Sequence, residues 1–285
     1  MGPVARVPPV VLVLTAITTL QFGAALGATL IDDVGAAGAA LLRLAFAAAI
    51  LMAVWRPRVA GREKGDLWLA AAFGATLGGM NLAIYEAIER IPLGIAVTIE
   101  FAGPLAVAVL ASRRRLDVLW AVLAAAGILV LADPGGGEVE LAGVLFALVA
   151  AVCWGLYIVI AARAGQRFRG SDGLALAMTL GVLVPLVPGI VSGGTGLLDG
   201  EVLAIALGVA LLSSVIPYSL ETEALRRMPK NVFGVLMSLE PGVAALAGFL
   251  VLSQDLGPRE LLAIGLVVTA SAGATRFAPP PPEPV

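Results

Sequence analysis

The stretch that decides the fold is residues 86–111, EAIERIPLGIAVTIEFAGPLAVAVLA, because it recurs later in the chain. Moved along by 137 positions, it falls on residues 223–248, EALRRMPKNVFGVLMSLEPGVAALAG. Six of the 26 positions are identical, and in both copies two prolines stand twelve residues apart. In the first copy the identical residues are Glu86, Ala87, Arg90, Pro92, Pro104 and Ala108. The sequence therefore predicts an internal repeat, against the alternative of a chance match between two alanine-rich stretches.

The whole chain has the composition of a membrane protein. Of its 285 residues 60% are hydrophobic and 13% are charged, whereas a soluble domain carries about 25% charged residues. The mean hydropathy is +1.00. The apolar runs are continuous rather than alternating in polarity, which favours transmembrane helices over β-barrel strands. Charge clusters and Gly or Pro positions divide the chain into ten apolar segments, at 8–30, 35–55, 67–87, 92–112, 117–133, 140–162, 173–191, 202–222, 231–252 and 260–277. The fold class predicted is an all-α polytopic membrane protein with ten transmembrane helices.

The orientation follows from the basic residues in the short loops. With the N-terminus inside, 15 of the 18 Lys and Arg residues lie in the inner loops or at the two ends of the chain. Only Arg90 and Arg259 then lie outside, and Arg43 lies within the second segment. The first apolar run, Val7–Leu30, is too long for the core of a cleaved signal peptide and is interpreted as a retained span. We therefore expect both termini to be cytoplasmic.

The repeat and the topology together predict two halves of opposite orientation. Each half holds five segments, an odd number, so corresponding segments must cross the membrane in opposite directions. The loop at 56–64 is basic while its counterpart at 192–201 is not, as this arrangement requires. Inverted repeats are typical of secondary transporters, with the substrate site near the midplane between the halves. We expect one five-helix repeat at 1–135, a second at 136–278 and a disordered Pro-rich tail at 279–285.

The composition excludes most enzyme chemistry. The chain has no histidine and a single cysteine, Cys153, which is interpreted as a small buried residue. Metal sites built from His and Cys, catalytic triads and disulfides are therefore excluded. A net charge of −2 gives no basic face for nucleic acid, and no nucleotide-binding loop is found. We expect no metal and no cofactor.

The stretch from Glu89 to Leu110 closely resembles the corresponding stretch of bacterial threonine/homoserine exporters, in the EamA-type group of the drug/metabolite transporter superfamily. The ten spans, the repeat, Trp154-Gly155 and the run Arg43–Phe46 are similar to the superfamily more broadly. The resemblance implies efflux of small metabolites across the bacterial inner membrane, driven by proton exchange.

Four polar or charged residues near the centres of apolar segments are candidates for the substrate and proton pathway: Gln21, Arg43, Glu100 and Glu240. The structural alternative is an Arg43–glutamate pair that locks two spans together. One cation against two carboxyl groups leaves one carboxyl that should hold a proton. Burial favours the protonated form and a nearby guanidinium favours the carboxylate, so the glutamate closer to Arg43 is the expected anion. We expect Glu100 to be that anion and leave open which glutamate carries the proton.

Two prolines predict helix kinks at the depth of these residues. Pro104 has no N–H for the carbonyl of Glu100, and Pro241 has none for that of Met237. A freed carbonyl in mid-membrane could accept an ammonium group. A kink that serves only helix packing is the alternative.

Further candidates come from spacing on one helix face. Asn81 and Tyr85 stand four residues apart and join the pathway prediction. Glu86 and Arg90, also four apart, predict an outer gate or a surface ion pair. Trp154 and Tyr157 could line the substrate path, although aromatic residues in helices more often serve packing.

The function predicted is secondary active export of small amino acids such as threonine or homoserine, by proton antiport with alternating access. A drug or other metabolite carrier of the same superfamily is the alternative within transport, and a membrane-embedded lipid-modifying enzyme is less favoured, so we expect no enzyme activity. The expected partners are the lipid bilayer, a small-molecule substrate and protons, and a homodimer is left open. The expected location is the bacterial inner membrane.

Overall fold

The computed structural model describes residues 7–57, 62–110, 115–132, 140–168, 172–228 and 230–276. Within these ranges all regular secondary structure is helical. This is what the apolar runs require, because a helix satisfies every backbone N–H and C=O within its own segment, where lipid offers no partner.

The first half of the chain forms six helices, two of which are separated only by Phe101. They are α1 (Pro9–Ala28), α2 (Ile31–Trp55), α3 (Lys64–Ile88), α4 (Leu93–Glu100), α5 (Ala102–Leu110) and α6 (Arg115–Ala132). Near its start α2 contains Gly35 with φ 71° and ψ 166°, a backbone conformation that side chains disfavour. The chain therefore turns there from α1 into the long part of α2.

The second half is more often interrupted. Its elements are α7 (Leu141–Arg167), α8 (Asp172–Gly181), α9 (Leu183–Gly193), the 3-10 helix η3 (Gly194–Leu198), α10 (Gly200–Ala210), the π-helix η4 (Leu211–Val215), α11 (Ile216–Arg227), α12 (Lys230–Met237), α13 (Glu240–Leu252) and α14 (Pro258–Arg276).

Among the described residues seven helical segments are long and apolar enough to cross a membrane, namely Pro9–Ala28, Ile31–Trp55, Lys64–Ile88, Leu141–Arg167, Asp172–Leu198, Gly200–Leu225 and Val232–Leu252. Two apolar helices, Leu93–Val107 and Val118–Val130, are shorter. The protein is therefore a multi-pass, all-helical membrane protein. The described parts of the ten predicted segments are mainly helical, with turns at Thr29–Leu30, Phe101, Val182 and Ser238–Leu239. The segments at 92–112, 117–133 and 260–277 are not among the seven.

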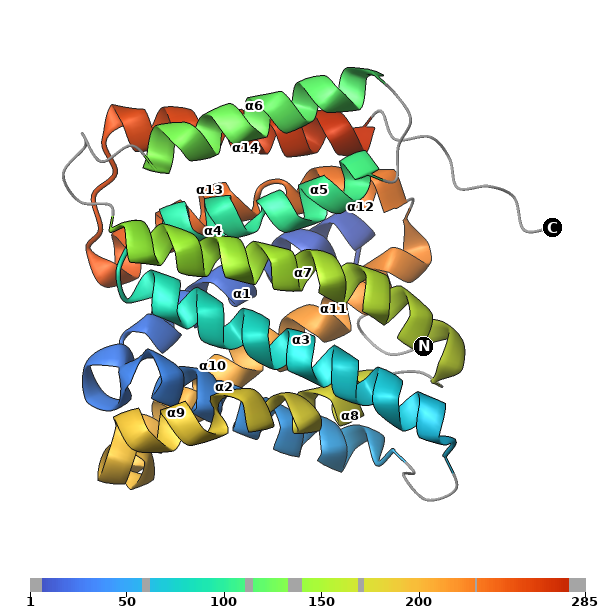
Figure 1. The fold of residues 1–285 in the computed structure, drawn as a ribbon, viewed down its shortest axis with the longest axis vertical. Coiled ribbons are helices and arrows are strands. Elements are labelled where there is room, and N and C mark those ends of the chain that lie inside the picture. Colours follow the sequence, from blue (N-terminus) through green and yellow to red (C-terminus); the bar gives the residue numbers. More distant parts are fainter. Residues whose placement is uncertain are drawn as a thin grey trace.

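The helices lie side by side in one bundle (Figure 1). Helices α6 and α14 pair at one edge, while α2 packs with α8 and α9 at the other. Between these edges α3 packs against α7 and α1 packs against α11. The end of α2, the start of α3 and the end of α7 lie on the same side of the bundle in this view.

Small residues bring neighbouring helices into direct backbone contact, as is common between membrane helices. A Cβ on Gly74 of α3 would lie 2.6 Å from the Ala177 carbonyl of α8, and Gly78 faces the Gly181 carbonyl. On α1, a Cβ on Gly23 would lie 2.8 Å from the Ser213 nitrogen of η4. The π-helix is thus held tightly against α1.

Candidate functional site

A cavity of about 490 Å³ lies within the bundle. Its lining comes from both halves of the chain. Seven of the residues predicted for the substrate and proton pathway line it, together with the predicted kink residue Pro104: Gln21, Arg43, Asn81, Glu100, Trp154, Tyr157 and Glu240. The predicted pathway residue Tyr85 and the kink residue Pro241 are not in the lining. Residues scattered over more than 200 positions of sequence therefore share one space.

Arg43 projects from α2 into this cavity and is only 6% exposed. Its Nη2 donates to the Ser213 carbonyl at 2.9 Å, and its Nε donates to Ser214 Oγ at 3.4 Å. The guanidinium carbon lies 5.9 Å from the centre of the Tyr85 ring. In the described part of the chain no carboxylate lies within 4.0 Å of Arg43 to form an ion pair. The predicted alternative of an Arg43–glutamate lock is therefore not what holds Arg43.

Both acceptors of Arg43 belong to the π-helix η4. This segment interrupts the helical run from α10 to α11, and Ser213 and Ser214 are fully buried within it. Ser213 Oγ donates to the Val209 carbonyl at 2.6 Å. Short π-helical turns are frequent at functional sites because they redirect backbone groups. Here the redirected group is a carbonyl that accepts from Arg43.

Three carboxyl groups share the cavity with this single guanidinium. Glu100 is the last residue of α4 and is 8% exposed, and Glu240 is the first residue of α13 and is fully buried. Neither oxygen of Glu240 has a hydrogen-bond partner within the described residues. The third, Glu221 on α11, was not among the predicted residues. It stands one residue before the predicted end of its segment at 222, but α11 continues to Arg227.

Glu100 and Glu240 both lie at breaks in their helices. The break at Phe101 comes three residues before Pro104, and the break at Ser238–Leu239 comes two residues before Pro241. Ser238 Oγ is 2.9 Å from Ser271 Oγ, a lining residue of α14. Discontinuous membrane helices are typical of substrate sites in transporters, since their ends present unpaired backbone groups at mid-depth.

Two buried amide oxygens of the cavity lining, Gln21 Oε1 and Asn81 Oδ1, are also without partners in the described structure. The other end of the Asn81 amide, Nδ2, donates to the Leu77 carbonyl at 2.9 Å. Buried polar groups are nearly always hydrogen-bonded, so these cavity-lining amides are available to a ligand. Tyr85 lies beside Arg43, with its hydroxyl against Gly27.

Two of the three aromatic residues of α7, Trp154 and Tyr157, both pack against other rings and line the cavity. Trp154 meets Phe101 edge-to-face, with ring centres 5.3 Å apart. The Tyr157 ring lies 5.5 Å from Phe73 at a tilt of 37°. Both rings also face the cavity, so the substrate-path and packing interpretations apply together. The neighbouring Tyr218 lines the cavity as well and was not predicted.

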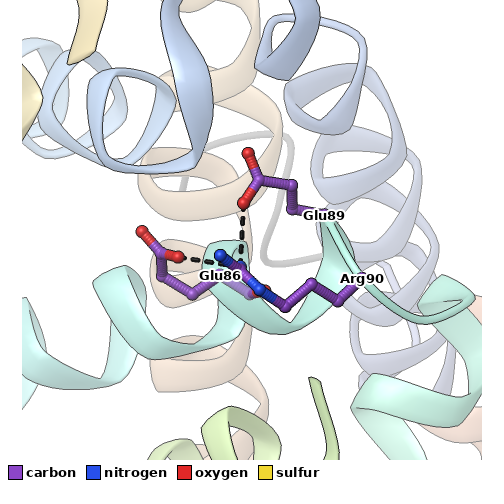
Figure 2. A network of polar contacts seen from close by, with 3 residues as sticks. All are labelled: Glu86, Glu89 and Arg90. Carbon is purple, nitrogen blue, oxygen red and sulfur yellow. Dashed lines mark hydrogen bonds and ion pairs between the residues drawn. The ribbon is translucent and has the colours of Figure 1, made fainter. Parts of the chain in front are cut away.

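The predicted pair Glu86 and Arg90 lies outside the cavity, at the end of α3 (Figure 2). Arg90 Nη1 is 2.8 Å from Glu86 Oε2 and also 2.8 Å from Glu89 Oε2, a contact the sequence did not predict. The Arg90 guanidinium carbon lies 5.1 Å from the centre of the Phe146 ring on α7. This network ties the end of α3 to the start of α7.

A cavity inside a multi-helix membrane bundle, with a guanidinium and three carboxyl groups among its described lining residues, is typical of a small-molecule transporter. The comparisons with known proteins agree. The chain belongs to the EamA-like transporter family, whose model matches residues 141–276. The resemblance to EamA-type transporters is thereby confirmed.

Two relatives support this membership over nearly the whole chain. The threonine/homoserine exporter RhtA of Escherichia coli K12 is 42% identical over 272 residues, covering 94% of this chain and 91% of the relative. The protein of the same name from Salmonella typhimurium LT2 is 40% identical over the same length and coverage. One crystal structure, 19% identical, matches 95% of this chain and 97% of its own with a TM-score of 0.61. At that identity it shows the fold alone.

Proposed function

We propose that the protein exports small amino acids such as threonine or homoserine, or closely related metabolites. The observation that carries this proposal is that Arg43 and Glu100 line the same cavity but form no ion pair with each other. An α-amino acid brings a carboxylate and an ammonium group, the complements of these two side chains. The identity to the RhtA exporters supports the same substrate class.

Each end of the substrate has an assigned partner in this proposal. A guanidinium has five N–H donors, and Arg43 uses Nη2 and Nε on Ser213 and Ser214. The remaining donors bind the substrate carboxylate. Glu100 receives the ammonium group, assisted by its own backbone carbonyl, for which Pro104 offers no N–H. The free acceptors of Gln21 and Asn81 suit a side-chain hydroxyl.

We further propose ten transmembrane helices in two inverted repeats, at 1–135 and 136–278. The shift of 137 that aligns the repeated stretches also pairs nine cavity-lining residues of the first half with nine of the second. The pairs are Leu20 with Tyr157, Gln21 with Ile158, Ala24 with Ala161, Met80 with Pro217, Asn81 with Tyr218, Ile84 with Glu221, Ile88 with Leu225, Val97 with Gly234, and Glu100 with Met237. Such correspondence favours a cavity on the axis that relates the halves.

The contacts between helices support the same two-fold relation between the halves. Helix α3 packs against α7, and its counterpart α11 packs against α1, the counterpart of α7. Likewise α4 and α5 pack against α7, and their counterparts α12 and α13 pack against α1, while α6 and α14, which correspond to each other, are in mutual contact. A two-fold relation between the halves maps the contacts of α7 onto those of α1 and the α6–α14 contact onto itself.

Two arginine contacts at opposite ends of the bundle are the proposed gates of alternating access. Glu86 and Arg90 close the outer end. Their repeat counterparts, Glu223 and Arg227, are 3.5 Å apart, and Arg227 Nη2 donates to the Val7 carbonyl just before α1 at 2.6 Å. Each gate joins the end of one helix to the start of another, so one can open while the other stays closed.

The proposed coupling ion is the proton, and the proposed location is the bacterial inner membrane with both termini cytoplasmic. A fully buried carboxyl without partners is neutralised by taking a proton, and Glu240 is such a group. The orientation rests on the excess of basic residues at the loops on one side. Arg62 pairs with Asp172 at 2.9 Å and Arg167 with Asp66 at 3.3 Å at that end.

Transport by the purified protein in proteoliposomes tests the function. Labelled threonine or homoserine should exchange across the membrane, and an imposed pH gradient should drive net movement. If neither exchange nor pH-driven movement of these amino acids occurs and an unrelated drug or metabolite is transported instead, the protein is a drug or metabolite carrier of the same superfamily. Reporter fusions after Arg58 should register as cytoplasmic and those at Gly194 as external. A cytoplasmic signal at Gly194 would remove the inverted-repeat proposal.

A further inference from the structure

We propose that Pro217 is a positioning residue for Arg43, acting through the Ser213 carbonyl. This inference rests on the proposed role of Arg43 in binding the substrate carboxylate. In a regular helix the N–H of residue 217 would bond to the carbonyl four residues earlier, which belongs to Ser213. Proline has no N–H, so the α-helical donor to this carbonyl is missing. Arg43 Nη2 donates to the same carbonyl, at 2.9 Å.

The surrounding structure keeps the carbonyl where Arg43 can reach it. Residues Leu211–Val215 form the π-helix η4, with the cap N–H of Ile216 bonded to the Leu211 carbonyl. Gly23 of α1 packs directly against the Ser213 backbone, which fixes the depth of the turn. Ser214 Oγ adds a second, longer contact to Arg43 Nε. Arg43 is therefore held by backbone geometry rather than by a carboxylate.

This arrangement matters for the charge of the site. A carboxylate partner would occupy the face of the guanidinium that a substrate carboxylate needs and would cancel its charge. A carbonyl satisfies part of the guanidinium and leaves its full positive charge. Tyr85 lies beside the same guanidinium, with its ring centre 5.9 Å from the guanidinium carbon. The side chain is thus oriented while its charge remains available for the substrate.

The test is Pro217→Ala, which supplies the missing N–H. The intrahelical bond should draw the Ser213 carbonyl back along the helix axis and release Arg43. Because alanine is favoured over proline inside a helix, the variant should be at least as thermally stable as the wild type. The KM for threonine or homoserine should nevertheless rise about tenfold, the loss of one charge-assisted hydrogen bond, with little change in maximal rate. Pro188→Ala in α9, an exposed proline outside the cavity, is the matched control and should leave the KM unchanged.

A double-mutant cycle separates this role from a general effect on the cavity. In an Arg43→Lys background, which lacks the fork of donors, Pro217→Ala should raise the KM little further. Equal effects in the two backgrounds would overturn the proposal. So would a wild-type KM in Pro217→Ala itself.

A second readout does not depend on transport. Phenylglyoxal labels arginine, and mass spectrometry gives the labelling rate of Arg43 in the purified protein. The rate should rise several-fold in Pro217→Ala and stay unchanged in Pro188→Ala. An unchanged rate would overturn the positioning role even if the wild type moved no amino acid, a result that by itself would refute only the proposed function. Pro217→Gly supplies the same N–H if the alanine variant does not accumulate, and failure of both to fold would also refute the inference.

Discussion

The change Glu240→Gln tests whether this buried carboxyl carries the coupled proton. Glutamine keeps the size of the side chain and fixes it in a neutral form. Glu240 is fully buried, and neither of its oxygens has a partner within the described residues. A proton carrier predicts that the variant loses pH-driven export, while exchange of substrate across the membrane persists.

The expected effect on stability is small because Glu240 makes no ion pair in the described structure. Breaking a buried ion pair costs about 3–5 kcal/mol, whereas exchanging one neutral unpaired group for another should change the free energy of unfolding by less than about 1 kcal/mol. Glu240→Met removes the unpaired polar group altogether and should stabilise the protein by about 1–3 kcal/mol. The variant should still be unable to couple transport to the proton gradient.

Three measurements on the same preparation decide the outcome: exchange in proteoliposomes, net export driven by a pH gradient, and thermal unfolding. Glu140→Gln is the matched control, because Glu140 is exposed at the start of α7 and outside the cavity. It should change none of the three. A loss of several kcal/mol in Glu240→Gln, with coupled export retained per folded molecule, would show that Glu240 is structural.

Three other changes have outcomes that follow from the geometry. Arg43→Gln should abolish or strongly impair amino-acid transport with normal membrane abundance, since a cation is required in the cavity, and full activity would limit Arg43 to packing. Glu100→Gln should weaken ammonium binding, while Glu100→Asp should retain part of the activity in the same exchange assay, and equal loss in both would contradict an ammonium site. Gly103→Ala should destabilise the protein by about 1–3 kcal/mol, because its Cβ would meet the Ala151 carbonyl of α7. Gly155→Ala, whose nearest neighbour would lie at 3.4 Å, should unfold at the wild-type temperature, and equal loss in both would refute the packing argument.

The site could be predicted where a polar residue interrupts an apolar run. Arg43, Glu100 and Glu240 stand out for this reason, because an ionisable group in mid-membrane is costly, and the structure brings all three to one cavity. Glu221 gave no such signal, since it opens the run Glu221-Thr222-Glu223, which resembles a solvated loop. The helix continues to Arg227 and carries Glu221 into the cavity lining.

Other features of the site depend on contacts between distant parts of the chain, which the sequence pattern does not show. Pro217 could have been recognised by the argument applied to Pro104, since it leaves the Ser213 carbonyl without its helical donor. That Arg43 fills this place depends on a contact across 170 residues of sequence. The helical character of the apolar runs was predictable, whereas their breaks into separate helices depend on local packing. Tyr85 shares a face with Asn81 as predicted, but its ring lies beside Arg43 and not in the cavity lining.

In the proposed repeat, corresponding residues of the two halves line the cavity. The polar groups proposed to bind substrate and proton stand at positions where the two halves carry different residues. With the shift of 137, Gln21 corresponds to Ile158 and Glu100 corresponds to Met237. The proposed anchors for the amino acid thus come from the first half, while the proposed proton carrier, Glu240, comes from the second. An ammonium group and a proton each neutralise one negative charge in the same cavity, so the arrival of one disfavours the other. Mutual exclusion of this kind is what exchange of a substrate for a proton requires, and it needs no direct contact between the two sites.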